Sequence, residues 1–166
     1  MGGRVYILYA AMKSAARSVG CRTDNEAVGA FAQAGHGSHT MTQPGDLKWA
    51  PLPSIAGAMA ATIEGPASQA GPFTMRLKLP ADSRIPPHFH PGVEHVTVMS
   101  GTFHLGHGDK FDESKLTALP TGSVAIMQAK SPHFATVKEE TIVQLHGIGP
   151  WSAVYINPAD DPSKKH

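Results

Sequence analysis

The chain has 166 residues, a formal net charge of +1 at pH 7 and only 16% charged residues. This length suits one domain with a packed core, and so small a net charge provides no electrostatic attraction to nucleic acid or to an anionic membrane. The 17 glycines and 14 prolines favour short strands joined by tight turns. No stretch approaches the ~20 apolar residues of a membrane span, and the single Cys21 excludes an intrachain disulfide.

Residues 1–45 differ in character from the rest of the chain and form the predicted leader and linker. Residues 12–17 are typical of the basic start of a secretory signal, and residues 30–34 end in Ala-x-Ala, as signal-peptidase sites do. The segment between them is polar, whereas a signal needs an apolar run of ~7 to 15 residues there. Two alternatives therefore stay open: export to the periplasm or beyond, and a disordered cytoplasmic leader.

The sequence after residue 45 predicts a β-rich domain. After Trp49, which we expect to anchor the leading strand, residues 73–79 alternate between apolar and polar side chains, so this strand has one buried and one solvated face. Many short strands bounded by Gly or Pro indicate a barrel or a sandwich. The further strands are expected at 58–64, 84–90, 94–99, 102–106, 124–128, 133–137, 141–146 and 152–157, with a surface loop at 109–115.

Residues 86–101 hold side chains that can bind a metal. On a strand, residues i and i+2 project from the same face, so His88 and His90 can direct their imidazoles at one point. Pro91 and Gly92 favour a turn that brings Glu94 back beside them. Two imidazoles and a carboxylate suit Zn, Fe, Mn, Co, Ni or Cu, whereas Ca and Mg prefer oxygen ligands alone. The sequence therefore predicts a site for one divalent transition metal.

The spacing of these residues resembles the first motif of the cupin superfamily, in which His-x-His is followed after three residues by Glu and after six more by Gly. Here His88, His90, Glu94 and Gly101 occupy those positions. The sequence around them is similar to that of small single-domain bacterial cupins, a group that indicates a fold and a metal without indicating one reaction. The resemblance covers residues 73–155 and implies an all-β jelly-roll barrel with a metal in its interior.

The second cupin motif runs Gly, five residues, Pro-x-Gly, two residues, His. This chain has Gly122 and His133 at its two ends, but Gln128 stands in the proline position and Lys130 in the position of the second glycine. Asp82 likewise stands where cupins have a glycine six residues before the first histidine. The resemblance implies that His133 is the fourth metal ligand, beside the two histidines and the glutamate of the first motif.

Three further residues are candidates for catalysis beside the metal. Gln144 and His146 alternate with Val143 and Leu145, so if the aliphatic pair fills the space between two sheets, the polar pair faces solvent or the cavity. In the cavity, His146 could act as a general base or as a hydrogen-bonding partner of a metal ligand. Tyr155, in the last predicted strand, is a candidate for the rim of the pocket.

We therefore predict a leader over 1–45, a cupin barrel over 46–157 and a tail over 158–166. By resemblance, cupins perform dioxygenation, isomerisation, decarboxylation and lyase reactions with this ligand set, so we expect a metal-dependent enzyme acting on a small organic molecule. One alternative is a non-catalytic module that binds a metal or a small ligand, and another is a barrel that keeps the histidines as hydrogen-bonded core residues without metal. The resemblance also implies a homodimer.

Overall fold

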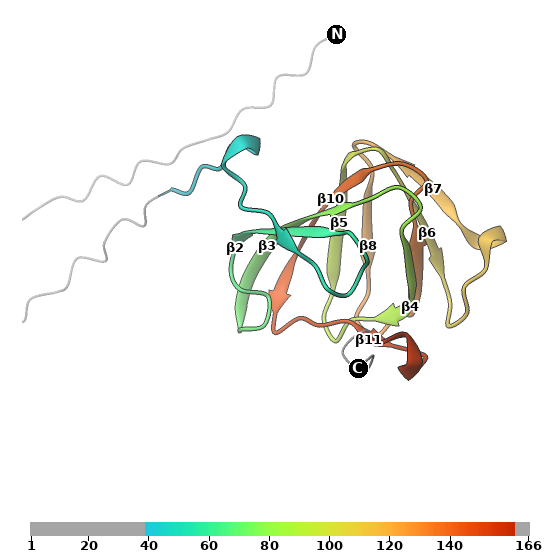
Figure 1. Ribbon diagram of the computed structural model, residues 1–166. Coiled ribbons are helices and arrows are strands. Elements are labelled where there is room, and N and C mark those ends of the chain that lie inside the picture. The colour runs from blue at the N-terminus through green and yellow to red at the C-terminus, as the bar shows by residue number, and fades with distance from the viewer. Residues whose placement is uncertain (1–38, 162–166) are drawn as a thin grey trace, which may run out of the picture. The chain divides into compact units, whose positions relative to one another are not determined.

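Two antiparallel β-sheets face each other and enclose the core (Figure 1). The structure is a computed structural model that describes residues 39–161. One sheet has the strand order β1 (Ala50–Pro51), β2 (Met59–Glu64), β3 (Gly71–Leu79), β10 (Thr141–Gly149), β5 (Glu94–Ser100) and β8 (Val124–Met127). The other has the order β11 (Val154–Tyr155), β4 (Arg84–Phe89), β9 (His133–Thr136), β6 (Thr102–His107) and β7 (Thr117–Pro120). The connections carry three 3-10 helices, η1 (Pro44–Asp46), η2 (Glu113–Lys115) and η3 (Pro158–Asp160).

The alternation predicted for residues 73–79 is observed in β3. Phe73, Leu77 and Leu79 are buried between the sheets, and Arg76, on the other face, donates a hydrogen bond to Gln144 on β10. β3 pairs with β10 along its whole length, because both strands carry apolar residues at every second position and so cover the same core. The all-β, two-sheet jelly-roll prediction is confirmed.

Strand bounds differ from the predicted ones near the C-terminus. The strand predicted at 141–146 continues to Gly149 as β10, while the one predicted at 152–157 is reduced to the two residues of β11. Pro150 and Pro158 flank this segment, and proline cannot donate a hydrogen bond to a neighbouring strand. The expected loop at 109–115 is observed and contains η2.

The predicted leader lies outside the described residues as far as residue 38, as does the predicted tail beyond residue 161. The contacts of the chain form one compact unit from Thr40 onward. Within residues 39–161, no helix has the length and apolar character needed to cross a membrane.

Two residues that stand in glycine positions of the cupin motifs have a left-handed backbone conformation. Asp82 has φ 62° and Lys130 has φ 61°, and no other described residue apart from glycine has a positive φ. This left-handed region is one that glycine adopts at little cost, whereas a Cβ atom disfavours it. The backbone N–H of Lys130 donates to the carbonyl of His90 at 2.8 Å. Lys130 therefore replaces the glycine of the second motif, and its hydrogen bond still connects the loop of that motif to the first motif.

Replacing Lys130 tests whether this conformation stores strain. An L-residue in the left-handed region costs ~1 to 2 kcal/mol, whereas glycine loses roughly 0.5 to 1 kcal/mol more backbone entropy on folding. Lys130→Gly should therefore leave the free energy of unfolding unchanged or raise it by up to about 1.5 kcal/mol. Lys130→Val should lower it by at least about 1 kcal/mol, since a β-branched side chain tolerates this region least. Chemical denaturation measures both, and a clear loss of stability in Lys130→Gly would contradict the assignment.

Candidate metal centre

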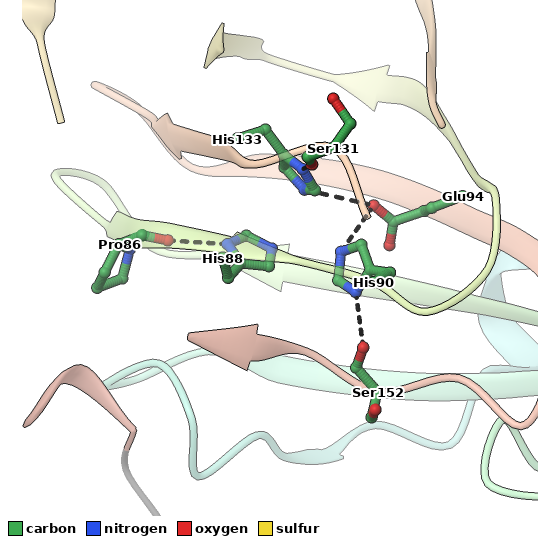
Figure 2. A network of polar contacts seen from close by, with 7 residues as sticks. All are labelled: Pro86, His88, His90, Glu94, Ser131, His133 and Ser152. Atoms are coloured by element: carbon green, nitrogen blue, oxygen red, sulfur yellow. Dashed lines mark hydrogen bonds and ion pairs between the residues drawn. The ribbon is translucent and has the colours of Figure 1, made fainter. Parts of the chain in front are cut away.

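Three histidines and one glutamate come together between the two sheets. His88 lies in β4 and His133 opens β9, and these two residues are direct partners in the antiparallel pairing of the strands. His90 follows β4 by one residue, and the turn after it carries the chain to the opposite sheet, where Glu94 opens β5. All four side chains are buried, with relative exposures of 7% or less. The predicted ligands from both motifs are therefore neighbours, as Figure 2 shows.

Each of the three imidazoles is held by a backbone carbonyl. The Nδ1 atom of His88 lies 2.8 Å from the carbonyl oxygen of Pro86, and that of His133 lies 3.0 Å from the oxygen of Ser131. The Nδ1 atom of His90 lies 2.9 Å from the carbonyl oxygen of Ser152 (Figure 2). A carbonyl oxygen can only accept, so Nδ1 carries the proton in all three rings. The Nε2 atom of each neutral ring is then left with a lone pair, which is the form that binds metals.

These lone pairs meet in one small region. One ring nitrogen from each of His88, His90 and His133 lies within 4.8 Å of the other two. Nitrogens bound to one ion at ~2.1 Å lie at most ~4.2 Å apart, so a small inward movement suffices to bring all three within bonding distance. A three-histidine site that can hold a metal ion is thus present.

Glu94 adds a carboxylate oxygen to the three imidazole nitrogens, and all four atoms present lone pairs without a hydrogen. Its Oε2 atom lies 3.3 Å from His90 Nε2 and 3.9 Å from His133 Nε2. The Nε2 atom of His90 is buried and has no hydrogen-bond partner. Because a neutral imidazole nitrogen and a carboxylate oxygen both present lone pairs, they repel each other unless a cation or a proton lies between them. The residues present therefore fit a metal ion.

Burial keeps two of these rings, His88 and His133, neutral. Desolvation, followed by the nearby charge of His133, lowers the pKa of His88 to about 3. Desolvation also lowers the pKa of His133. Both shifts mean that the rings lack the second proton at neutral pH, so their lone pairs stay available.

The site forms part of the wall of a cavity of about 320 Å³ between the sheets. Two residues along the strands from His133 and Glu94, on the same faces, lie Ala135 and Val96, and both line the cavity. Leu145 pairs with Val96 across β10 and β5 and also lines it. The metal ligands thus lie beside an apolar space that is large enough for a small molecule.

The structure places two of the predicted catalytic residues, Gln144 and His146, away from the cavity. Val143 and Leu145 line the cavity, so Gln144 and His146 lie on the opposite face of β10. There His146 Nε2 is 3.0 Å from Nδ1 of His95. The structure therefore does not bring Gln144 and His146 to the metal ligands, and the alternative in which this pair lies on the outer face is the observed one.

Tyr155 does lie at the cavity. It pairs with His88 across β11 and β4, its ring centroid is 5.9 Å from that of His88, and it contributes to the cavity wall. Burial raises the pKa of the Tyr155 phenol, and the carboxylates of Asp161 and Asp160 raise it further. The hydroxyl therefore stays protonated at neutral pH and can donate a hydrogen bond.

Trp151 is a cavity residue that the sequence analysis did not identify. Its ring stacks on that of His90 at 4.6 Å between centroids with an interplanar angle of 22°, and it lines the cavity. No motif marks it, because the contact joins two segments separated by about 60 residues. It adjoins Ser152, whose carbonyl holds the His90 ring. The segment after β10 thus supports the second histidine from two sides.

Two facing antiparallel sheets with this histidine cluster between them define a cupin. The sequence profile of the ChrR cupin-like domain matches residues 37–151, and the chain belongs to this family. A comparison with proteins of curated function found no match.

Solved structures share the fold. An acetylacetone dioxygenase from Acinetobacter johnsonii has 13% sequence identity and a TM-score of 0.56, with 85% of this chain and 86% of that chain covered. The polyketide cyclase RemF from Streptomyces resistomycificus has 15% identity and a TM-score of 0.56, with 75% and 90% covered. An RmlC-like cupin from Shewanella frigidimarina has 13% identity and a TM-score of 0.53, with 66% and 89% covered. At these identities the likeness establishes the fold alone.

Removing one ligand tests the metal site. His133→Ala should lower the affinity for Zn²⁺ by more than about 100-fold, because even residues that only orient a metal ligand contribute 10 to 100-fold. His95→Ala is the matched control, since His95 follows Glu94 directly and bonds to His146 on the outer face of the sheet. Calorimetric titration of metal-stripped protein measures both variants. Equal affinities in His133→Ala and the unaltered protein would show that the metal is held elsewhere.

Proposed function

We propose that this chain is a metal-dependent enzyme that acts on a small organic molecule. The observation that supports the proposal is a buried set of three imidazole lone pairs and one carboxylate, placed in the wall of a cavity. In a site that served stability alone, N–H or O–H groups of the protein would donate hydrogen bonds to these nitrogen and oxygen atoms. Here the buried Nε2 of His90 has no such partner, which favours a bound ion.

His88, His90, His133 and Glu94 would hold one divalent transition metal, for which Zn, Fe, Mn, Ni, Co and Cu are all suitable on ligand chemistry. Four protein ligands leave room for a substrate oxygen on an ion that takes six. A divalent ion bound there supplies a Lewis acid that polarises a coordinated oxygen. The carbonyls of Pro86, Ser131 and Ser152 contribute by keeping each imidazole in the orientation that presents Nε2.

The chain's own residues would shape the reaction around that oxygen. Tyr155, beside His88, stays protonated and is positioned to donate a hydrogen bond to a molecule in the cavity. The apolar walls exclude water, which strengthens every polar interaction within the site. Fold relatives that carry dioxygenase and cyclase names differ in their chemistry, so the reaction type is left to experiment.

A non-catalytic binding module is the second candidate, and one observation favours it. Apart from the four proposed ligands, the described residues of the cavity wall include only four with a polar side-chain group, Ser54, Trp151, Tyr155 and Asp161. Catalysis by proton transfer usually needs an acid or base within hydrogen-bond reach of the substrate. A cavity with so few such groups also suits a domain that binds a ligand without converting it.

Metal analysis combined with a turnover screen separates the two candidates. The purified protein is expected to contain about one transition-metal ion per chain by elemental analysis. It should convert at least one member of a panel of small acids, ketones and diols, tested with and without oxygen. Metal binding and ligand binding without turnover would favour the binding module. A protein that takes up no metal in stoichiometric amount would contradict both.

A further variant tests the role of Tyr155. Tyr155→Phe removes only the hydroxyl, so kcat/KM for the compound identified in the screen should fall between about threefold and tenfold, the usual contribution of one neutral hydrogen bond. The metal content should stay unchanged because the phenol is not one of the proposed ligands. An unchanged kcat/KM would show that Tyr155 only packs against His88.

A further inference from the structure

Apart from the metal ligands and Tyr155 of β11, the strands that enclose the cavity contribute only apolar side chains. Leu77, Val96, Leu105, Ala135 and Leu145 come from five different strands, and all of them line the cavity. The charged residues of β3 lie on its other face, where Arg76 bonds to Gln144. The part of the wall that these five residues form therefore offers no hydrogen-bonding side chain to a ligand.

Apart from the metal ligands, the polar groups of the wall come from two parts of the chain. Ser54 belongs to the connection between β1 and β2, while Trp151, Tyr155 of β11 and Asp161 belong to the segment after β10. Among the described lining residues there is no lysine or arginine. A second anionic group or a hydroxyl that lay against the apolar wall of β3, β5, β6, β9 and β10 would be buried without a partner. Such burial costs several kcal/mol for a neutral group and more for a charge.

The volume sets a limit on ligand size. Liquid water occupies about 30 Å³ per molecule, so a cavity of about 320 Å³ holds roughly ten groups of that size. The metal ligands provide one place for an oxygen-bearing group, and the wall formed by β3, β5, β6, β9 and β10 is otherwise apolar. Size and polarity together thus describe a molecule with one polar end.

We propose that the ligand of this cavity has an apolar body, with about ten non-hydrogen atoms in all, and a single oxygen-bearing head group that lies against His88, His90 and His133. Medium-chain acyl and alkyl compounds and small aryl compounds fit this class, whereas sugars, polyols and dicarboxylates do not. The inference rests on the metal site of the proposed function and adds the substrate class. It follows from the apolar wall that β3, β5, β6, β9 and β10 form beyond the metal ligands.

A series of carboxylates tests the class directly. Butanoate, hexanoate, octanoate and dodecanoate share one head group and differ only in apolar length. Each methylene that enters an apolar cavity adds about 0.8 kcal/mol, which is about fourfold in affinity. We expect the affinity of the zinc-loaded protein to rise about fourfold per methylene as far as octanoate and to stop rising by dodecanoate. An affinity that is independent of chain length would overturn the proposal.

Two further compounds test whether the end of the ligand opposite the head group binds an apolar wall. 6-Hydroxyhexanoate and adipate have the same chain length as hexanoate but carry a hydroxyl or a second carboxylate at the other end. We expect 6-hydroxyhexanoate to bind about tenfold more weakly than hexanoate, and adipate more weakly still, because the cavity wall leaves these groups unpaired. Binding of either compound as tight as that of hexanoate would contradict an apolar inner wall.

Tryptophan fluorescence reports binding from inside the cavity. The chain has two tryptophans, and Trp49 lies apart from the cavity wall, against Lys78. In the Trp49→Phe variant only Trp151 remains, which lines the cavity and stacks on His90. A saturable change in its emission with octanoate is expected. Calorimetry on the unaltered protein provides the affinities independently.

Two variants test whether the apolar body of the ligand lies in the cavity. Ala135→Val narrows the cavity beside His133 and should weaken octanoate binding at least tenfold while changing butanoate binding by less than about threefold. Ala118→Val is the control, because Ala118 is exposed on β7. Thermal unfolding checks that both variants fold. If Ala135→Val fails to fold, Leu145→Ala, which enlarges the cavity, should instead extend the rise in affinity beyond octanoate, and an unaltered limit would contradict the placement.

The His133→Ala variant separates this inference from the proposed function. If the dependence on chain length persists in this variant with unchanged affinities, the ligand class is correct but the metal plays no part in binding, and the proposed function is wrong. If the unaltered protein binds zinc at the expected site but shows no dependence on chain length, the proposed function stands and the inferred substrate class is wrong.

Discussion

Three hydrogen bonds from histidine Nδ1 atoms to backbone carbonyls determine what this site can do. They fix the same tautomer in His88, His90 and His133 and turn the three Nε2 lone pairs toward one region. Two of the carbonyls lie two residues before the histidine they hold, so short stretches of β4 and of the segment before β9 are sufficient. The third, from Ser152, comes from the opposite end of the domain sequence. The metal centre therefore depends on the docking of the C-terminal segment as well as on the motif strands.

The two sheets give this arrangement its rigidity and its opening to a ligand. His88 and His133 lie in strands of the five-stranded sheet, Glu94 lies in the six-stranded sheet, and residues 91–93 join the two sheets beside the site. Lys130 holds this turn through its bond to the carbonyl of His90. Because the walls are apolar beyond the ligands, the same side chains that form the core also shape the binding space. Stability and ligand selection thus share residues such as Val96 and Leu145.

Much of this could be predicted from the sequence, because period-two alternation and ligand spacing are local signals. They identified β3 and brought His88, His90 and Glu94 together. The alternation in β10 grouped Gln144 with His146 but could not say which face meets the cavity, since Val143 and Leu145 suit both a filled core and an apolar cavity wall. The carbonyl of Ser152 and the stacking of Trp151 on His90 were beyond prediction, because backbone acceptors carry no residue signature and both contacts span about 60 residues.

The account is tested most directly by the tautomers of the three histidines. Long-range nitrogen–proton correlation spectra of metal-stripped protein, with side chains assigned through the single substitutions, distinguish the Nδ1–H form from the Nε2–H form. The account predicts the Nδ1–H form for His88, His90 and His133, and a change in all three Nε2 resonances when one equivalent of Zn²⁺ is added. An Nε2–H form in any of the three, or Nε2 resonances that do not respond to zinc, would contradict a metal centre built on these lone pairs.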